Sequence, residues 1–339
     1  MALSGEAMLK ETDRSAKLRG AARFREENGA AGLEGGAKGP GSEGKMKQNG
    51  FGGRGDKIAA RSIFAISATG VVIMVFIIVF LVANGLPALH ESSLKDILLS
   101  FDWYPTEEPP ALGMLPLIAG TLAATLLSSL LGLPVALALA IYTAEIAPKR
   151  LRELFKMMME LLGFVPSIVL GFIGMLVLAP ALQNRFNAAT GLNLLNASLL
   201  LGFLIIPVVA SLSEEALSSV PRELRDASYA LGATRWETII RVVVPGAKSG
   251  MLSAALLGMM RALGETMVVL MAAGGAAILP KSLMDPIRPL TSTIAAEMGE
   301  TPVGSVHYHA LFFAGLILMA VTLTINLLSM FIEKRGNCK

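Results

Sequence analysis

The 339-residue chain is 53% hydrophobic and only 16% charged, with a mean hydropathy of +0.61. This balance excludes a typical soluble domain and indicates a protein that crosses a membrane several times. The net charge of +3 does not require a nucleic-acid partner, because membrane proteins carry excess Lys and Arg in their cytoplasmic loops.

Residues 1–56 are predicted to form a disordered cytoplasmic tail. Residues 1–55 contain 13 glycines and mixed charges, and their only aromatic residues are Phe24 and Phe51. Such a composition buries too little apolar surface to offset the loss of chain entropy on folding. The start of the chain has no apolar core of the kind found in a cleavable signal peptide. A solvated tail is favoured over one whose basic residues contact lipid head groups.

Residues 57–335 are predicted to form an all-α domain with about six membrane-spanning helices. A bilayer core of about 30 Å requires about 20 apolar residues in a helix. Within the third predicted span, Pro166 indicates a break or a restart of the helix. The six stretches that qualify are residues 62–84, 113–142, 157–182, 192–213, 250–276 and 308–332.

Basic residues gather in alternate loops, which predicts the orientation of the chain. They precede the first span, lie between spans two and three and between spans four and five, and follow span six. The intervening loops contain few of them. The positive-inside rule then places both termini in the cytoplasm, in agreement with an even number of spans.

The cytoplasmic loop at residues 214–248 is predicted to form two short amphipathic helices. Gly232 stands where the first helix needs a C-cap, and Thr234 can cap the start of the second. Pro245 is expected to end the second helix before span five. A pair of such helices suits docking into a groove on a soluble partner, and an interfacial position on lipid is the alternative.

Arg261 and Glu265 are predicted to lie on one face of the fifth span. A lone arginine near the centre of a bilayer costs about 2.5–3.5 kcal/mol on insertion scales, so its presence needs a reason. A structural ion pair is one reading. We favour a polar substrate pathway, because buried ion pairs are weak stabilisers and intramembrane ionisable groups usually mark a route.

Three hydroxyl residues of span two could contribute further hydrogen-bond donors to that pathway. Thr121, Thr125 and Ser128 follow one another at helical spacing. Plain hydrogen bonds between helices are the alternative role for these side chains.

Other chemistry is less well supported by the sequence. No G-x-x-x-x-G-K-[ST] motif occurs, so ATP is expected to be hydrolysed by a different chain. A membrane-embedded enzyme using Glu265 or Glu297 is a remote alternative, because few polar groups from other spans accompany either residue. His307 and His309 are expected to be interfacial anchors rather than metal ligands, and we expect no metal site.

The cytoplasmic loop resembles the EAA motif of permeases of ATP-binding cassette (ABC) importers. That pattern is E-A-A, three residues, G, nine residues and I-x-L-P. Here Asp226, Ala227 and Ser228 stand for E-A-A, followed at the same spacing by Gly232 and by Val-x-Val ending at Pro245. The resemblance implies that these residues couple the permease to an ATP-binding subunit.

Longer segments are similar to the phosphate-specific ABC permeases of the PstC type. They are "LGATRWETIIRVVVPGA", "RALGETMVVLMAAGG", "DPIRPLTSTIAAEMGE" and "GSVHYHALFFAGL", and the likeness covers about residues 58–335. It implies a subunit of an ATP-driven phosphate importer in the cytoplasmic (inner) membrane. The implied partners are a PstA-type permease, a PstB-type ATPase dimer and an extracytoplasmic PstS-type phosphate-binding protein.

The resemblance leaves the exact substrate and subunit type open. A PstA-type permease, or a permease for molybdate, sulfate or phosphonate, is the alternative. No cofactor is expected on this chain, because the partner ATPase uses the ATP. Asp285 and Arg288, in the outer loop 277–307, are predicted to dock the binding protein, with an ordinary solvated loop as the alternative.

Overall fold

The computed structural model describes the backbone of residues 54–336 and the side chains of residues 60–331. The predicted tail therefore lies outside the described residues, except for residues 54–56, which belong to the first turn of α2 (Arg54–Gly85). The chain divides into two units within α2. All the other described elements belong to the second unit, Ser67–Lys339.

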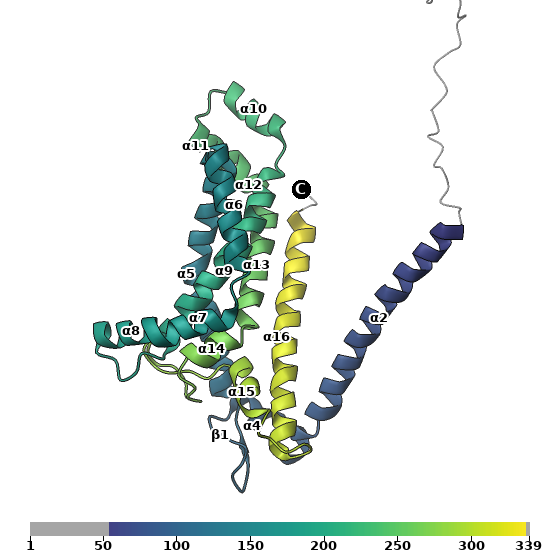
Figure 1. Ribbon diagram of the computed structural model, residues 1–339, viewed down its shortest axis with the longest axis vertical. Coiled ribbons are helices and arrows are strands. Elements are labelled where there is room, and N and C mark those ends of the chain that lie inside the picture. Colours follow the sequence, from purple (N-terminus) through teal and green to yellow (C-terminus); the bar gives the residue numbers. More distant parts are fainter. Residues whose placement is uncertain (1–53, 337–339) are drawn as a thin grey trace, which may run out of the picture. The chain divides into compact units, whose positions relative to one another are not determined.

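The second unit is built around long helices, as the sequence predicts. Figure 1 shows α5, α9, α13 and α16 side by side, and α9 packs against both α5 and α13. Among the described residues, five helices are long and apolar enough to cross a membrane, or six when one bent pair counts as a span. The four helices that lie side by side are α5 (Leu115–Ile141), α9 (Leu194–Ser218), α13 (Lys248–Leu263) and α16 (Val306–Gly336).

The contact between α5 and α9 is close enough to bring their backbones together. A Cβ added at Gly132 of α5 would lie 2.6 Å from the carbonyl oxygen of Gly202 in α9. Small residues at such crossings permit dense packing between membrane helices. The two helices therefore pack tightly against each other at this crossing.

The third predicted span, residues 157–182, is wrong in its bounds because the chain breaks inside it. α6 (Lys149–Gly163) ends before Pro166, and α7 (Ser167–Ile173) begins directly after it. Proline forces its preceding residue out of the helical region, so the predicted restart is confirmed. η2 (Gly174–Leu178) and α8 (Ala179–Phe186) continue α7, and in Figure 1 this run crosses the direction of α5 and α9.

The fifth predicted span, residues 250–276, is also interrupted. α13 ends at Leu263, and α14 (Met267–Ala272) starts after a short break. Ahead of α13, the run α11 (Arg235–Thr238), η3 (Ile239–Val243) and α12 (Val244–Gly246) is bent by 69° from it. Pro245 lies inside α12 and does not end the helix as predicted. The helix continues through Pro245 because the wide π turn of η3 leaves room for the proline ring. The bend falls two residues later, at Ala247.

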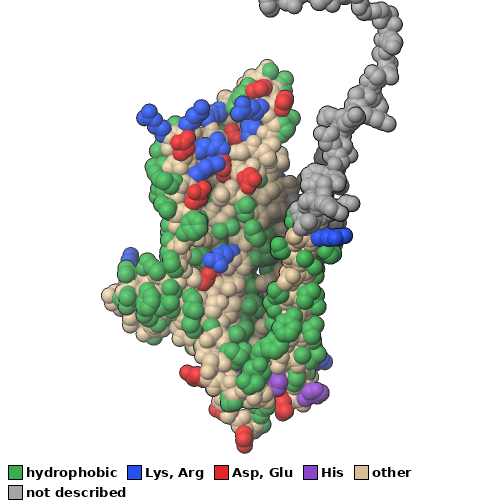
Figure 2. Space-filling model, turned by 45° about the vertical axis from the view of Figure 1, so that its right-hand side comes forward, with side chains coloured by type: hydrophobic (Ala, Val, Ile, Leu, Met, Phe, Trp, Pro, Cys, Tyr) green, Lys and Arg blue, Asp and Glu red, His purple; other side chains and the backbone are tan. Residues whose placement is uncertain are grey.

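The two ends of the second unit have different architectures. α10 (Arg222–Ala230) and α11 form a helical hairpin at one end, and in Figure 2 the Lys and Arg side chains gather there. The predicted loop starts later than residue 214, because α9 continues to Ser218. Smaller elements occupy the opposite end, namely α3 (Ala88–Glu91), α4 (Leu94–Leu99), β1 (Trp103–Tyr104), β2 (Ala111–Leu112) and α15 (Leu290–Glu297).

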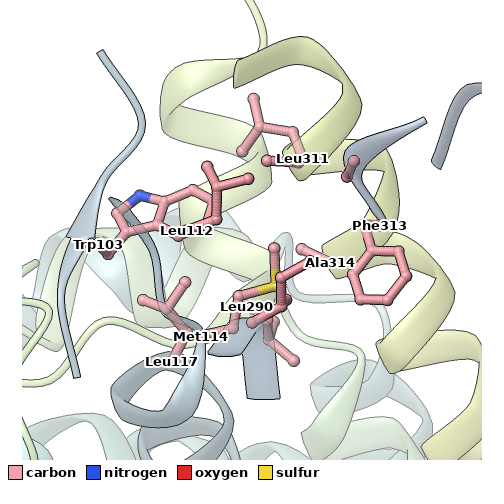
Figure 3. Close-up of a cluster of buried hydrophobic side chains, with 11 residues drawn as sticks. Trp103, Leu112, Met114, Leu117, Leu290, Leu311, Phe313 and Ala314 are labelled. Carbon is pink, nitrogen blue, oxygen red and sulfur yellow. The ribbon is translucent and has the colours of Figure 1, made fainter. Parts of the chain in front are cut away.

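A buried apolar cluster holds this opposite end together. Trp103 lies opposite Leu112 in the antiparallel pair of β1 and β2. Both side chains join residues from the start of α5, from α15 and from α16 in one cluster (Figure 3). The cluster fixes the β-hairpin against the membrane helices. Its labelled members are Trp103, Leu112, Met114, Leu117, Leu290, Leu311, Phe313 and Ala314.

Candidate functional site

Arg261 and Glu265 lie at the break between α13 and α14. The Arg261 Nη2 and Glu265 Oε2 atoms are 3.7 Å apart. Arg261 stands in the last turn of α13, but Glu265 follows the end of that helix. The sequence predicted that the two residues share one face of a continuous helix, and this prediction is wrong. The helix ends at Leu263, and the Arg261 cation in its last turn interacts favourably with the negative C-terminal end of the helix dipole.

The two partners of this ion pair differ in exposure and in anchoring. The Glu265 side chain is only 5% exposed, whereas that of Arg261 is 50% exposed. The Glu265 carboxylate accepts the N–H of Thr266, and its backbone carbonyl accepts the Thr291 hydroxyl at 2.8 Å. Among the described residues no other side chain pairs with Arg261. Its guanidinium group therefore keeps donors available for a ligand.

Thr121, Thr125 and Ser128 are all buried in α5, and their hydroxyl groups donate within that helix. The acceptors are the carbonyl oxygens of Leu117, Thr121 and Thr125, at 2.7, 2.8 and 3.0 Å. Thr121 Oγ1 also accepts the backbone N–H of Leu290 at 2.9 Å. In this arrangement the three hydroxyl protons are used in hydrogen bonds within α5 and are not available to a substrate. Thr121 is nevertheless linked to Glu265, because Thr291 directly follows Leu290.

A groove between α9 and α13 leads along the membrane helices toward Arg261. On α13, Gly250, Ala254, Leu257 and Arg261 recur at helical spacing and share one face. The groove has a volume of about 360 Å³. It ends one turn before Arg261. Its lining residues are Leu212, Glu215, Ala216, Ser219, Gly250, Ser253, Ala254 and Leu257.

The helical hairpin is capped as the sequence predicts. Gly232 has a φ of +84°, and its N–H donates to the Tyr229 carbonyl while the N–H of Ala233 donates to the Ser228 carbonyl. This pair of bonds is the Schellman arrangement that ends many helices. Thr234 and Glu237 then form a complete capping box at the start of α11. Both predicted caps are confirmed.

The hairpin presents an exposed surface that contains most of the EAA-like residues. No residue of α10 is buried, and Asp226, Ala227 and Pro245 are exposed. Ser228 faces the other arm of the hairpin, where its hydroxyl lies 2.9 Å from that of Thr238. Leu231 and Trp236 are 89% and 60% exposed. Large apolar side chains displayed beside charged ones are typical of a protein–protein contact.

Sequence reasoning missed two glutamates near this end, one that holds the hairpin and one that holds α6 against α9. Glu145, in η1 (Tyr142–Ile146), pairs with Arg225 of α10 at 2.8 Å. Glu214 is buried in α9 and pairs with Arg152 and Lys156 of α6. The two cations neutralise the Glu214 carboxylate, which explains why α9 continues through a residue that looked like the start of a loop.

Asp285 and Arg288 both line a cavity of about 810 Å³ at the opposite end, beside the β-hairpin. Arg288 pairs with Glu297 at 2.8 Å. The Asp285 carboxylate accepts the backbone N–H groups of Lys281 and Ser282, both at 2.8 Å. Asp285 thus shapes its own loop.

Glu297 was considered in the sequence only as a remote enzymatic acid, and the structure makes it the centre of a network. It pairs with His307 at 2.7 Å and accepts the Trp103 indole N–H at 3.2 Å, in addition to its contact with Arg288. His309 instead lies 2.7 Å from the carbonyl oxygen of Asn84. The two histidines therefore have separate partners, and each joins α16 to another segment.

A known protein family matches more than half of the chain. The profile of the family described as "Binding-protein-dependent transport system inner membrane component" matches residues 132–335. The chain belongs to this family. It is therefore a permease subunit of an ABC importer and a multi-pass protein of the inner membrane.

Individual relatives cover most of this permease. It is 40% identical to "Probable ABC transporter permease protein YqgH" of Bacillus subtilis, over 77% of this chain and 85% of that one. It is 32% identical to "Phosphate transport system permease protein PstC" of Pasteurella multocida, over 79% of this chain and 91% of that one. The resemblance to PstC-type permeases is thereby confirmed.

Solved structures share the fold at lower identity. The permease matches the MetNI methionine ABC transporter with a TM-score of 0.52 and 21% identity, over 68% of this chain and 99% of that one. It matches a bacterial ABC transporter for alginate import with a TM-score of 0.56 and 16% identity, over 82% and 97% of the two chains. Both likenesses concern the fold alone.

Proposed function

We propose that this permease subunit carries inorganic phosphate across the cytoplasmic membrane in an ATP-driven importer. The observation that carries the proposal is Arg261, a half-exposed arginine at a break in a membrane helix. A guanidinium group donates paired hydrogen bonds that match the oxygens of a phosphate. The similarity to PstC proteins of several bacteria supports the same substrate.

Glu265 gives this site its selectivity for a protonated oxyanion. It is held in place by its contacts with Thr266 and Thr291 and stays close to the arginine. At neutral pH, phosphate carries a proton that can be donated to a carboxylate, whereas sulfate and molybdate carry none. A fixed carboxylate therefore favours phosphate and repels fully ionised oxyanions. The groove between α9 and α13, which ends one turn before Arg261, provides a path from that point toward the hairpin end.

The ATPase drives this permease by acting on the helical hairpin. The hairpin and both termini of the chain are on the cytoplasmic side of the membrane. The basic residues gathered at that end support this orientation. Asp226, Ala227, Ser228, Gly232 and Pro245 form the contact with a PstB-type ATPase dimer, which binds the ATP. The permease itself then needs no cofactor, and a PstA-type subunit completes the membrane part of the transporter.

The cavity beside Asp285 and Arg288 receives the extracytoplasmic phosphate-binding protein. Its walls combine cations, carboxylates and the aromatic side chains Trp103 and Tyr104. Such a mixed rim is typical of contacts that form and dissociate repeatedly.

Uptake by the purified transporter tests the proposed substrate. The complete complex is reconstituted in vesicles with its binding protein, and labelled phosphate, sulfate, molybdate and phosphonate are offered with and without ATP. We expect ATP-dependent uptake of phosphate and at least tenfold less of the other oxyanions. Preferential uptake of another oxyanion would overturn the assignment, and uptake without ATP would overturn the ATP-driven mechanism.

A further inference from the structure

Both arms of the helical hairpin are fastened to one residue, Glu145, in the η1 extension of α5. Arg225 of α10 pairs with the Glu145 carboxylate at 2.8 Å, and Arg235 of α11 donates to the Glu145 backbone carbonyl. The side chains of Glu145 and Arg225 are only 12% and 16% exposed. A pair this well shielded is screened less by salt than an exposed one.

Arg225 also holds the end of α9. Its guanidinium group donates to the carbonyl oxygens of Leu217, in the last turn of α9, and of Val220, just beyond the end of that helix. Carbonyl groups at a helix end need such additional donors. The hairpin is thus attached to the ends of α5 and α9 together. Because α5 and α9 are in close backbone contact at Gly132 and Gly202, we expect a displacement of the hairpin to move both helices together.

The far part of α5 is connected to the proposed phosphate site. Thr121 accepts the backbone N–H of Leu290, and the next residue, Thr291, donates its hydroxyl to the Glu265 carbonyl. An unbroken series of contacts therefore runs from Glu145 along α5 to the residue that faces Arg261. Contiguous contacts of this kind can carry coupling when they join rigid elements.

We propose that Glu145 is the positioning residue that transmits movement of the helical hairpin to α5, and through it to Glu265 and Arg261. The proposal rests on the proposed function, in which an ATPase docks on the hairpin. Without the Glu145–Arg225 contact, movement of the docked hairpin still reaches α13 through α12 but is no longer passed to α5, so Glu265 and Arg261 no longer move together. ATP hydrolysis then continues without transport.

The test measures how much phosphate is transported per ATP hydrolysed by the complete transporter in vesicles. The variants are Glu145→Gln, Arg225→Gln and the two combined. Glu153→Gln is the matched control, since Glu153 is an exposed glutamate of α6 for which the described residues provide no ion pair. We expect each single variant to lower the ratio at least fivefold. The double variant should lower it no further than Arg225→Gln alone, because that change already breaks the link that Glu145→Gln breaks.

Two results would overturn the role of Glu145. In the first, the variants reach the membrane in smaller amounts, while the assembled complexes keep the normal ratio, as a purely structural pair requires. In the second, the losses in the double variant multiply, which means that the two residues act separately. If Glu145→Gln fails to assemble, Arg225→Lys decides the matter. It keeps the charge and loses the fork, so the ratio should still fall.

A crosslink separates this inference from the proposed function. Leu231→Cys, in a chain with Cys338 changed to Ser, should crosslink to the ATPase both with Glu145 intact and with Glu145→Gln. An intact crosslink with a lowered ratio supports the role of Glu145, and an intact crosslink with a normal ratio refutes it alone. Loss of the crosslink in the otherwise unchanged chain would refute docking on the hairpin, and with it both proposals.

Discussion

Arg225 and Arg261 each pair with a glutamate, but the protein uses the two guanidinium groups very differently. Arg225 is 16% exposed, lies 2.8 Å from its carboxylate and also binds two backbone carbonyls. Arg261 is 50% exposed and lies 3.7 Å from the Glu265 carboxylate, which also accepts the N–H of Thr266. The first arginine is committed to the fold, whereas the second keeps unused donors at a place where an unpaired arginine is unfavourable.

This difference separates a structural ion pair from a ligand site when both have the same composition. Using several donors of one arginine within the fold, as Arg225 does, fixes neighbouring elements relative to one another. Leaving most donors open in a membrane helix has no benefit for folding, since the charge is still partly desolvated. Substitutions at the two arginines should therefore have different consequences, and the following experiments measure them.

Among the single substitutions, the largest effect is expected from Arg261→Lys. Lysine keeps the charge and loses the planar fork, and hydrogen bonds to charged groups contribute about 1.5–3 kcal/mol each. Phosphate uptake should therefore fall about 10- to 100-fold while the complex assembles and hydrolyses ATP. Arg185→Lys, at an exposed arginine of α8, is the matched control and should transport normally.

The double variant Arg261→Met, Glu265→Leu separates a ligand site from a structural pair. It replaces both charges by apolar groups, which restores the stability of a purely structural pair. We expect normal membrane levels and no phosphate uptake. Normal uptake in this variant would contradict the pathway proposed for Arg261 and move it into the same class as Arg225.

The next largest effect is expected at Gly232. Its φ of +84° disfavours any side chain, although a Cβ there would meet no atom within 4 Å. Gly232→Ala should therefore strain the backbone by about 1–2 kcal/mol without crowding, and shift the hairpin to other conformations about 5- to 30-fold more often. We expect ATP-driven transport to fall while the subunit still inserts in the membrane.

Gly163→Ala provides the control for the added methyl group. Gly163 also has open space around its Cβ position, but its φ is not positive. Equal transport losses in the two alanine variants would mean that the backbone conformation at Gly232 is not what matters. Crosslinking of Leu231→Cys to the ATPase, measured in both variants, reports directly on the position of the hairpin.

Arg288 lies between the two extremes, and a smaller effect is expected around it. It is 24% exposed and paired with Glu297, yet it also lines the cavity proposed to receive the binding protein. Changing Arg288 itself would disturb the Glu297 network, so Lys281→Glu on the cavity wall is the cleaner test. Exposed charge pairs contribute about 0.2–1 kcal/mol, so the KM for the loaded binding protein should rise by at most about fivefold.

The salt dependence of this KM distinguishes docking from a general charge effect. A direct charge contact should weaken as salt rises, which reduces the difference between Lys281→Glu and the unchanged chain. Lys95→Glu, at an exposed lysine of α4 outside the cavity, is the matched control. Equal KM values in the two variants would remove the cavity from the docking surface.

Local features of this permease were predictable from the sequence, and long-range contacts were not. The caps at Gly232 and Thr234 depend on residues three or four positions apart, and both predictions are confirmed. The helix break after Leu263 was missed because hydropathy alone does not register Gly264. A single glycine weakens a helix by about 1 kcal/mol and ends it only when tertiary contacts favour the break.

The long-range contacts of Glu145 and Glu297 show why part of the site could not be predicted. Arg225 stands 80 residues after Glu145, and Trp103 stands 194 residues before Glu297. Such pairs exist only once the helices are packed, and an exposed loop charge looks the same in the sequence. The i, i+4 spacing identified Arg261 and Glu265 as partners, but only the structure shows which of the two is open.

The smallest predicted effect concerns Glu237, whose carboxylate closes the capping box of α11. The backbone N–H of Thr234 is the main reason that the pKa of Glu237 is held below its ordinary value of 4.5, and the Thr234 hydroxyl adds to the effect. A lowered pKa in the folded protein means that the ionised form supports the cap. This support is complete above the ordinary pKa and is lost as the pH falls through the lowered value.

The cap should therefore contribute unchanged between pH 8 and pH 6 and weaken only in more acidic solution, well below about pH 4.5. Hydrogen-exchange protection of the α11 amides, corrected for the intrinsic effect of pH, measures this directly. Glu237→Gln should abolish the acid-dependent step, and Thr234→Ala should lower protection at every pH by about 1 kcal/mol. A step that persists in Glu237→Gln would assign the acid sensitivity of the hairpin to another carboxylate.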